Sequence, residues 1–283
     1  MSIMKIKVAR TIPALRHVTA NWRETGQTWA LVPTMGALHA GHLKLAKQAV
    51  QLADHVVASI FINPKQFGHN EDLSRYPRNE EGDIAQFQGA GVDLVFAPSS
   101  DAIYPNGFAT SIHMSGPAKV GLEDRFRPDF FDGVATVVAK LLIAADAHYA
   151  MFGEKDYQQL QVVKQLVRDL GLETKIVGIE TERDADGLAL SSRNRYLSKL
   201  ERQQATAIFK NLTQAAIKIR GGIKPQSATR AASRSLTTLG FKVDYVVARN
   251  AETLAIPKQD GEPLRLLAAA WLGKTRLIDN IAV

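Results

Sequence analysis

The sequence predicts an α/β fold in which a parallel sheet carries helices on both faces, followed by a smaller C-terminal α+β domain. Two observations support this prediction. Short apolar segments alternate with helix-like patterns up to about residue 184, and the order then changes to helices first and strands last. Strands that alternate with helices pair in parallel and are buried on both faces, so the first part predicts a Rossmann-like sheet. We expect residues 1–184 and 185–283 to form the two domains.

The predicted elements follow in chain order. Apolar runs rich in β-branched residues and bounded by Gly, Pro or Asp predict strands at 29–33, 55–62, 92–97, 148–152 and 174–179. Amphipathic patterns predict helices at 43–53, 134–142 and 160–170. In the second domain we expect helices at 199–220 and 227–239, then strands at 242–249, 265–272 and 276–281. Ligands of parallel sheets bind beyond the carboxyl ends of the strands, so the loops after strands should carry the functional residues.

Composition excludes several classes of protein. The 283 residues include no cysteine, which excludes disulfides, cysteine-ligated metals and thiol catalysis. The longest apolar stretches, such as 134–147, fall short of the roughly 20 residues that a membrane span needs. The N-terminus has neither the apolar core nor the cleavage site of a signal peptide. We therefore expect a cytoplasmic protein with no membrane partner.

The net charge of +7 is unevenly distributed. Residues 1–184 contain 19 Lys and Arg against 21 Asp and Glu, a balance of −2, whereas residues 185–283 contain 16 against 7, a balance of +9. Such an excess is explained either by a solvated basic helix surface or by a role in facing an anion. Nucleic acid is the less favoured anion, because no Lys and Arg stripe is interleaved with aromatic residues, which make up 7% of the chain. We expect no nucleic-acid partner.

The segment after the first predicted strand is the best candidate for chemistry. It reads Pro-Thr-Met-Gly-Ala-Leu-His-Ala-Gly-His over residues 33–42 and leads directly into a predicted helix. Gly36 and Gly41 allow a ligand close to the backbone, and a helix N-terminus favours phosphate. His39 and His42 lie on one side of the first turn, where both imidazoles could meet phosphates. A zinc pair and plain loop histidines are the alternatives; zinc is disfavoured because neither cysteine nor a His-Glu-x-x-His pattern is present.

These residues resemble a known family. His39-Ala40-Gly41-His42 resembles the H-x-G-H signature of the nucleotidylyltransferase superfamily, and the wider run over 32–42 is similar to the pantothenate synthetase family. Further runs match that family in order, at 61–67, 76–78, 153–159, 187–194, 270–273 and 276–280. The resemblance spans essentially the whole chain. Another nucleotidylyltransferase acting on a different small substrate is the alternative.

The resemblance implies a reaction in which ATP activates pantoate as an acyl adenylate, which β-alanine then converts to pantothenate with release of AMP. It implies that Mg²⁺ accompanies ATP and that the enzyme is a homodimer. His42, His39 and Lys155 would be catalytic, while Gln66, Gln159 and Asn63 would bind pantoate or β-alanine. ATP would be bound by Met35, Gly36, Ala37, Leu38, His39, Ala40, Gly41, His42, Gly153, Glu154, Lys155, Asp156, Glu182, Leu190, Ser191, Ser192 and Arg193.

Some positions depart from the family pattern. Glu182 stands where most relatives have an apolar residue, and no metal ligand is assigned. In the segment 122–133, which the family uses as a flap over the site, Asp124 and Asp129 replace glycines and Phe130 replaces a histidine.

Overall fold

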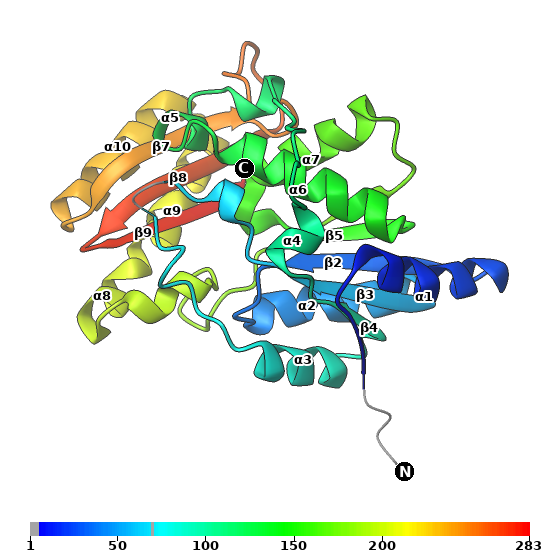
Figure 1. The fold of residues 1–283 in the computed structure, drawn as a ribbon. Helices are drawn as coiled ribbons and strands as arrows, with labels where there is room; N and C mark the ends of the chain where they lie inside the picture. Colours follow the sequence, from blue (N-terminus) through cyan, green and yellow to red (C-terminus); the bar gives the residue numbers. More distant parts are fainter. Residues whose placement is uncertain (1–5, 69–70) are drawn as a thin grey trace. The chain divides into compact units, whose positions relative to one another are not determined.

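A computed structural model describes residues 6–68 and 71–283 and divides the chain into two compact units. Unit 1 comprises Met1–Glu154 and Val162–Ile179, and unit 2 comprises Lys155–Gln161 and Glu180–Val283. Each unit has a sheet of its own (Figure 1). Among the described residues, we find no helix with the length and apolar character that crossing a membrane requires.

Unit 1 is built on a six-stranded sheet in which every pair of neighbours is parallel. The strands lie in the order β1, β4, β3, β2, β5, β6. Their bounds are β1 Lys7–Ala9, β2 Trp29–Thr34, β3 His55–Ile60, β4 Leu94–Phe96, β5 Tyr149–Gly153 and β6 Lys175–Ile179. All five strands predicted for this part of the chain are therefore present.

Helices cover both faces of this sheet. They are α1 Ile12–Glu24, α2 Ala40–Leu52, α3 Glu80–Gly89, α4 Ser100–Ile103, α5 Glu123–Phe126, α6 Phe130–Ala145 and α7 Tyr157–Asp169, with short 3-10 turns η1 Pro64–Gln66 and η2 Gly116–Ala118. The first residues of α7, up to Gln161, belong to unit 2, as do Lys155 and Asp156 of the 3-10 turn η3 Glu154–Asp156. Helix α2 packs on β2, β3 and β5, and α6 packs on β2 and α1. Four consecutive residues of β2, from Trp29 to Val32, are buried. Alternate residues of a strand point to opposite faces, so both faces are covered and the predicted parallel α/β fold is confirmed.

Some elements of unit 1 were not predicted. Strand β1 pairs with β4 at the edge of the sheet. It has three residues, and so short a strand shows no periodic pattern in the sequence. Helix α3 buries only Asp83 and Phe87, so it has no apolar stripe to recognise.

Unit 2 combines helices with an antiparallel sheet, as predicted for the C-terminal part. Its elements are η4 Ser192–Tyr196, α8 Lys199–Ala205, α9 Ala207–Arg220, α10 Pro225–Thr238, β7 Lys242–Asn250, β8 Leu264–Leu272 and β9 Thr275–Ala282. The strand order is β7, β8, β9, and α9 and α10 contact this sheet. The core combines Leu212 and Leu236 from the helices with Leu266, Ala268 and Ala270 from β8.

The single helix predicted over 199–220 is wrong. The segment forms two helices, α8 and α9, that meet at Thr206. Thr206 is buried, and its hydroxyl donates a hydrogen bond to the carbonyl of Gln203 at 3.0 Å. A β-branched residue whose hydroxyl binds the preceding turn competes with regular helix geometry, which apolar periodicity does not reveal.

Candidate active site

The chain order of the sheet locates the ligand-binding edge of unit 1. Strand β2 lies between β3 and β5; β3 and β4 follow on one side of it, and β5 and β6 on the other. Parallel sheets bind ligands where the strand order reverses, beyond the carboxyl ends of the strands. Here that point lies after Thr34 of β2 and Gly153 of β5. The predicted segment 35–42 and the pair Gly153 and Glu154 come directly after these two strand ends.

His39 and His42 form the N-terminal cap of α2. Nδ1 of His39 accepts a hydrogen bond from the backbone N–H of Gly41 at 3.2 Å, and Nδ1 of His42 accepts from the N–H of His39 at 3.4 Å. The ring centroids lie 4.1 Å apart. Because Nδ1 accepts in both rings, a neutral imidazole carries its proton on Nε2. The pair can therefore present two Nε2–H donors at the positive end of a helix dipole.

A buried carboxylate holds the loop before the histidines. Asp83 of α3 is 2% exposed, and its two oxygens accept hydrogen bonds from the backbone N–H of Ala37 at 2.8 Å and of Leu38 at 3.0 Å. Ala37 has a left-handed φ of 54°. Gly36 has a φ of 77°, and a Cβ there would lie 2.8 Å from Asp83 Oδ2. The loop thus needs Gly36 both for its backbone angle and for space, and Asp83 fixes its path.

The predicted substrate residues Asn63 and Gln66 form one hydrogen-bonded cluster after β3. Asn63 is 1% exposed and donates to Gln66 Oε1 and to the carbonyl of Gly133, both at 3.1 Å. Gln66 in turn donates to Sδ of Met35 at 2.9 Å. Tyr104 donates to Asn63 Oδ1 at 2.8 Å, and burial raises the pKa of Tyr104 to about 12. Met35, Asn63 and Gln66 are therefore brought together, with the amide of Gln66 oriented by its neighbours.

The segment 122–133 supports this cluster. Arg127 forms a two-point ion pair with Glu71, at 2.6 and 2.7 Å, and donates to the carbonyl of Gln66 at 3.0 Å. Two departures from the family pattern have structural roles here. Asp124 accepts hydrogen bonds from the N–H groups of residues 121 and 122, and the ring of Phe130 lies 3.6 Å from the guanidinium of Arg127.

Unit 2 carries the remaining predicted residues. Lys155 lies in η3 with 19% of its side chain exposed, 3.9 Å from Asp156. Ser191 caps η4 by accepting the N–H of Arg193 at 3.2 Å, and the N–H of Leu190 donates to the carbonyl of Glu182 at 2.9 Å. Ser192 and Arg193 begin η4, while Gln159 lies in α7. The short loop between Glu182 and Leu190 thus leads the chain into the Ser-Ser-Arg segment.

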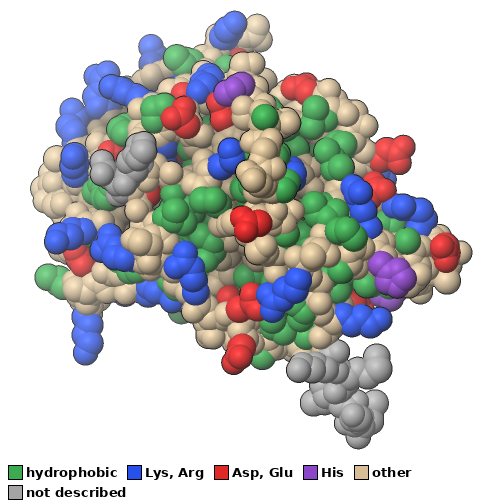
Figure 2. Space-filling view, viewed as in Figure 1, with side chains coloured by type: hydrophobic (Ala, Val, Ile, Leu, Met, Phe, Trp, Pro, Cys, Tyr) green, Lys and Arg blue, Asp and Glu red, His purple; other side chains and the backbone are tan. Residues whose placement is uncertain are grey.

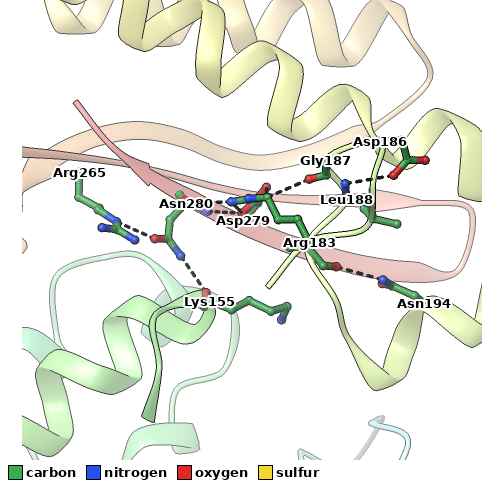
Figure 3. A network of polar contacts seen from close by, with 10 residues as sticks. Lys155, Arg183, Asp186, Gly187, Leu188, Asn194, Arg265, Asp279 and Asn280 are labelled. Carbon is green, nitrogen blue, oxygen red and sulfur yellow. Dashed lines mark hydrogen bonds and ion pairs between the residues drawn. The ribbon is translucent and has the colours of Figure 1, made fainter. Parts of the chain in front are cut away.

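Sequence reasoning missed the residues that hold these segments. Asp83, Tyr104 and Arg127 do so in unit 1, and Asp279 and Asn280 do so in unit 2 (Figure 3). The available signals were the resemblances of the segment 122–133, which contains Arg127, and of the run 276–280 to the family, and neither gave these roles. Within the parts of the chain that the structure describes, no three His, Asp or Glu residues gather as a metal site would require.

A parallel sheet with a polar loop and a helix N-terminus at its switch point is the arrangement of α/β proteins that bind nucleotides or other phosphates. The sequence pattern of the pantoate–β-alanine ligase family matches residues 7–282, and the chain belongs to this family.

Comparison with individual proteins agrees with this assignment. The chain is 53% identical to pantothenate synthetase 2 of Bradyrhizobium diazoefficiens, over 98% of each chain. A crystal structure of pantothenate synthetase from Thermus thermophilus superposes with a TM-score of 0.92, at 42% identity and covering 98% of this chain and 99% of that one. A pantoate–β-alanine ligase from Francisella tularensis, solved as a complex with βγ ATP and β-alanine, superposes with a TM-score of 0.82 at 35% identity, covering 98% and 97%. The resemblance drawn from the motifs is confirmed.

Proposed function

We propose that this protein condenses pantoate with β-alanine at the expense of ATP, giving pantothenate, AMP and pyrophosphate. In the first step a carboxylate oxygen of pantoate attacks the α-phosphorus of ATP, and the bond to the bridging oxygen of the β-phosphate breaks. In the second step the amine of β-alanine attacks the acyl carbon, AMP leaves, and the nitrogen loses a proton. Activation is needed because a free carboxylate is a poor electrophile. Membership of the ligase family over residues 7–282 is the observation that carries this proposal.

In unit 1, His39 and His42 are proposed to stabilise the departing pyrophosphate. Their Nδ1 atoms accept backbone N–H groups, which directs the Nε2–H donors to other partners. Negative charge that develops on phosphate oxygens is stabilised by such oriented donors and by the dipole of α2. The surrounding residues Met35, Gly36, Ala37, Leu38, Ala40, Gly41, Gly153 and Glu154 are proposed to line the ATP site.

In unit 2, Lys155 is proposed to place a positive charge against the phosphates. Ser191, Ser192 and Arg193 offer two hydroxyls and a guanidinium for phosphate oxygens. Asp156, Glu182 and Leu190 are proposed to complete the nucleotide contacts. Gln66 and Gln159 are proposed to bind pantoate, because a side-chain amide can both donate to a carboxylate and accept from a hydroxyl. Asn63, which is buried and donates to the amide of Gln66, is proposed to take part in binding pantoate or β-alanine.

Two further parts of the proposal, the metal and the oligomeric state, rest on family membership. Mg²⁺ is proposed to enter with ATP, bridging its phosphates and keeping most of its waters, so that few protein ligands are needed. A homodimer is proposed, and light scattering would report twice the 31.0 kDa of one chain. A cytoplasmic location stays a prediction. So does the division of the chain into an ATP- and pantoate-binding domain of residues 1–184 and a C-terminal lid domain of residues 185–283.

The test of the proposed function identifies the products. The protein is incubated with ATP, Mg²⁺, pantoate and β-alanine, and the nucleotide product is separated from pyrophosphate. We expect AMP and pyrophosphate in equal amounts, with pyrophosphate release requiring pantoate but not β-alanine. Formation of ADP, or turnover that ignores pantoate, would contradict the proposal.

A pair of substitutions tests the two nitrogens of His42. His42→Ala removes both, whereas His42→Asn keeps an acceptor near Nδ1 for the His39 N–H and removes Nε2. We expect both variants to lose roughly 10²- to 10³-fold in the rate of adenylate formation, as is typical for a lost oriented donor. Only His42→Ala should also lose the hydrogen bond from the His39 N–H, at a cost of about 0.5–1.5 kcal/mol in unfolding free energy. A His42→Asn variant with the normal rate would exclude the Nε2 role.

A further inference from the structure

The last strand of unit 2 carries two adjacent buried polar residues that bind other segments of this unit. Asp279 is 5% exposed and Asn280 is 3% exposed, and both belong to β9. Consecutive residues of a strand point to opposite faces, so the two side chains reach different segments. Figure 3 shows Asn280 directed toward Lys155 and Asp279 directed toward Arg183.

Asn280 holds the backbone at Lys155. Its Nδ2 donates to the carbonyl oxygen of Lys155 at 2.8 Å, and its Oδ1 accepts from Nε of Arg265 at 2.6 Å. Arginine can only donate, so Arg265 fixes which end of the amide faces Lys155. The guanidinium of Arg265 also lies 4.1 Å from the ring of Tyr157, whose hydroxyl donates to the carbonyl of Ala251 at 2.9 Å. The turn that carries Lys155 is therefore fixed to the sheet of unit 2 at two points, residues 155 and 157.

Asp279 holds the loop that precedes the Ser-Ser-Arg segment. Its two oxygens accept from Arg183 at 2.7 and 2.8 Å, and only 17% of the Arg183 side chain is exposed. Arg183 donates in addition to the carbonyl of Gly187 at 3.0 Å, and its guanidinium lies 4.0 Å from the ring of Phe209. The backbone N–H of Asn280 donates to Asp279 Oδ1 at 2.7 Å, which links the two contacts.

We infer that Asn280 and Asp279 are positioning residues, Asn280 for Lys155 and Asp279, through Arg183, for the loop that leads into Ser191–Arg193. This inference rests on the proposed function, which gives those segments their contact with ATP. Lys155 carries a flexible side chain on a three-residue 3-10 turn, so the path of its backbone determines where the ammonium group can reach. A displacement of about 1 Å in such a group can cost on the order of 10²-fold in rate.

Asn280→Asp is the most direct test. The substitution keeps the size of the side chain and the contact with Arg265, but it turns an oxygen toward the Lys155 carbonyl in place of a donor. Adenylate formation is measured as pantoate-dependent pyrophosphate release at varied ATP and pantoate. We expect kcat to fall on the order of 10- to 100-fold, with the KM for pantoate within about twofold of the wild-type value. A variant that folds and keeps the wild-type kcat overturns the role of Asn280.

Asn211→Asp is the matched control. Asn211 is 9% exposed in α9, and its Nδ2 donates to a backbone carbonyl, that of Ala207, at 2.9 Å. Like Asn280, Asn211 lies in unit 2 and donates from its side-chain amide to a backbone carbonyl. The residue that accepts this bond has no proposed contact with substrate. Thermal unfolding is measured for the Asn280→Asp and Asn211→Asp variants. If Asn280→Asp has a Tm far below that of Asn211→Asp, the kinetic comparison is made with Asn280→Ala instead. We expect comparable losses of Tm but a loss of kcat only at position 280; equal losses of kcat at both positions overturn the inference.

Repeating the Asn280→Asp substitution in a Lys155→Ala protein distinguishes a positioning role of Asn280 from general destabilisation. In a Lys155→Ala protein the group that Asn280 positions is absent, so Asn280→Asp should reduce kcat by less than about twofold further. The same fold loss in both backgrounds overturns the link between Asn280 and Lys155, as does a Lys155→Ala protein with the wild-type rate. Failure of the proposed function itself is distinguishable, because the wild-type protein would then form no AMP from ATP and pantoate with β-alanine.

Discussion

Single buried polar side chains determine the geometry around the proposed ATP loop. The two oxygens of Asp83 accept the N–H groups of Ala37 and Leu38, directly before the histidine pair. A carboxylate suits this task because both of its oxygens are acceptors, whereas an amide has one acceptor and one donor. Asp83 therefore fixes the backbone of the proposed ATP loop, and both of its oxygens accept backbone N–H groups of that loop.

Asp83→Asn should loosen that loop. One of the two buried N–H groups would face the donor end of the new amide, at a cost of about 1–3 kcal/mol in unfolding free energy. We also expect a higher KM for ATP with little change in the KM for β-alanine. Urea unfolding and steady-state kinetics measure the two effects. Glu81→Gln, an exposed carboxylate on the same helix, is the control and should change neither.

Tyr104 gives a pH dependence that can be predicted. Burial raises its pKa from 10.0 to about 12, and its hydroxyl donates to Asn63. The folded state therefore keeps a proton that the unfolded state loses near pH 10. The stabilisation is complete below pH 10 and is lost as the pH rises through about 12.

Unfolding free energy is then compared between the wild type and Tyr104→Phe at intervals from pH 9 to pH 12. The wild type should lose more stability over this window than the variant, because the variant lacks the titrating group. Other tyrosines and the lysines titrate equally in both proteins and cancel. Parallel curves would show that burial does not hold the proton on Tyr104.

Among the secondary-structure elements, helix α6 packs directly against η1, the turn that carries Gln66. A Cβ on Gly133 would lie 2.1 Å from the carbonyl oxygen of Lys65, and the carbonyl of Gly133 accepts the amide of Asn63. Only a glycine allows this approach, because the obstacle is backbone and cannot rotate away. The position of η1 is thus set by the packing of α6 as well as by its own sequence.

Gly133→Ala should displace η1 and with it Gln66. We expect a loss of about 1–3 kcal/mol in unfolding free energy, as for other overpacked sites, and a raised KM for pantoate with a smaller change for ATP. Gly89→Ala is the matched control, because the space around Gly89 is open at the end of α3. That variant should be unchanged or stabilised by up to about 1 kcal/mol. Equal kinetics for the two variants would refute the link between α6 and the pantoate site.

At the scale of the whole molecule, the structure explains much of the positive charge of residues 185–283. Lys and Arg side chains gather over the helices of unit 2 in Figure 2. The exposed ones include Lys199, Lys210, Lys218, Arg220, Lys224, Arg230, Arg234 and Lys242. Arg276, in contrast, is largely buried and paired with Asp244. Much of the excess is therefore solvated surface rather than a designed anion site.

Such a surface should bind oligonucleotides only weakly and without specificity. Binding that depends on exposed charges falls steeply with salt, so we expect it to vanish by about 200 mM salt. Fluorescence anisotropy with a labelled oligonucleotide measures this, and the KM for ATP at the same salt concentrations is the control. Tight binding that survives this salt would restore nucleic acid as a partner.

Patterns in the amino-acid sequence were enough to predict the parallel α/β fold, the family and the residues expected to bind ATP. It could do so because strand and helix periodicity are local, and because a run such as 33–42 combines glycines and histidines in neighbouring positions. The contacts that fix the positions of those residues became visible only in the tertiary structure. Asp83 lies more than 40 positions from the N–H groups that it binds, and Asn280 lies 125 positions from the carbonyl of Lys155. Contacts between residues so far apart in the sequence form only when distant segments pack together. No local sequence pattern can therefore predict them.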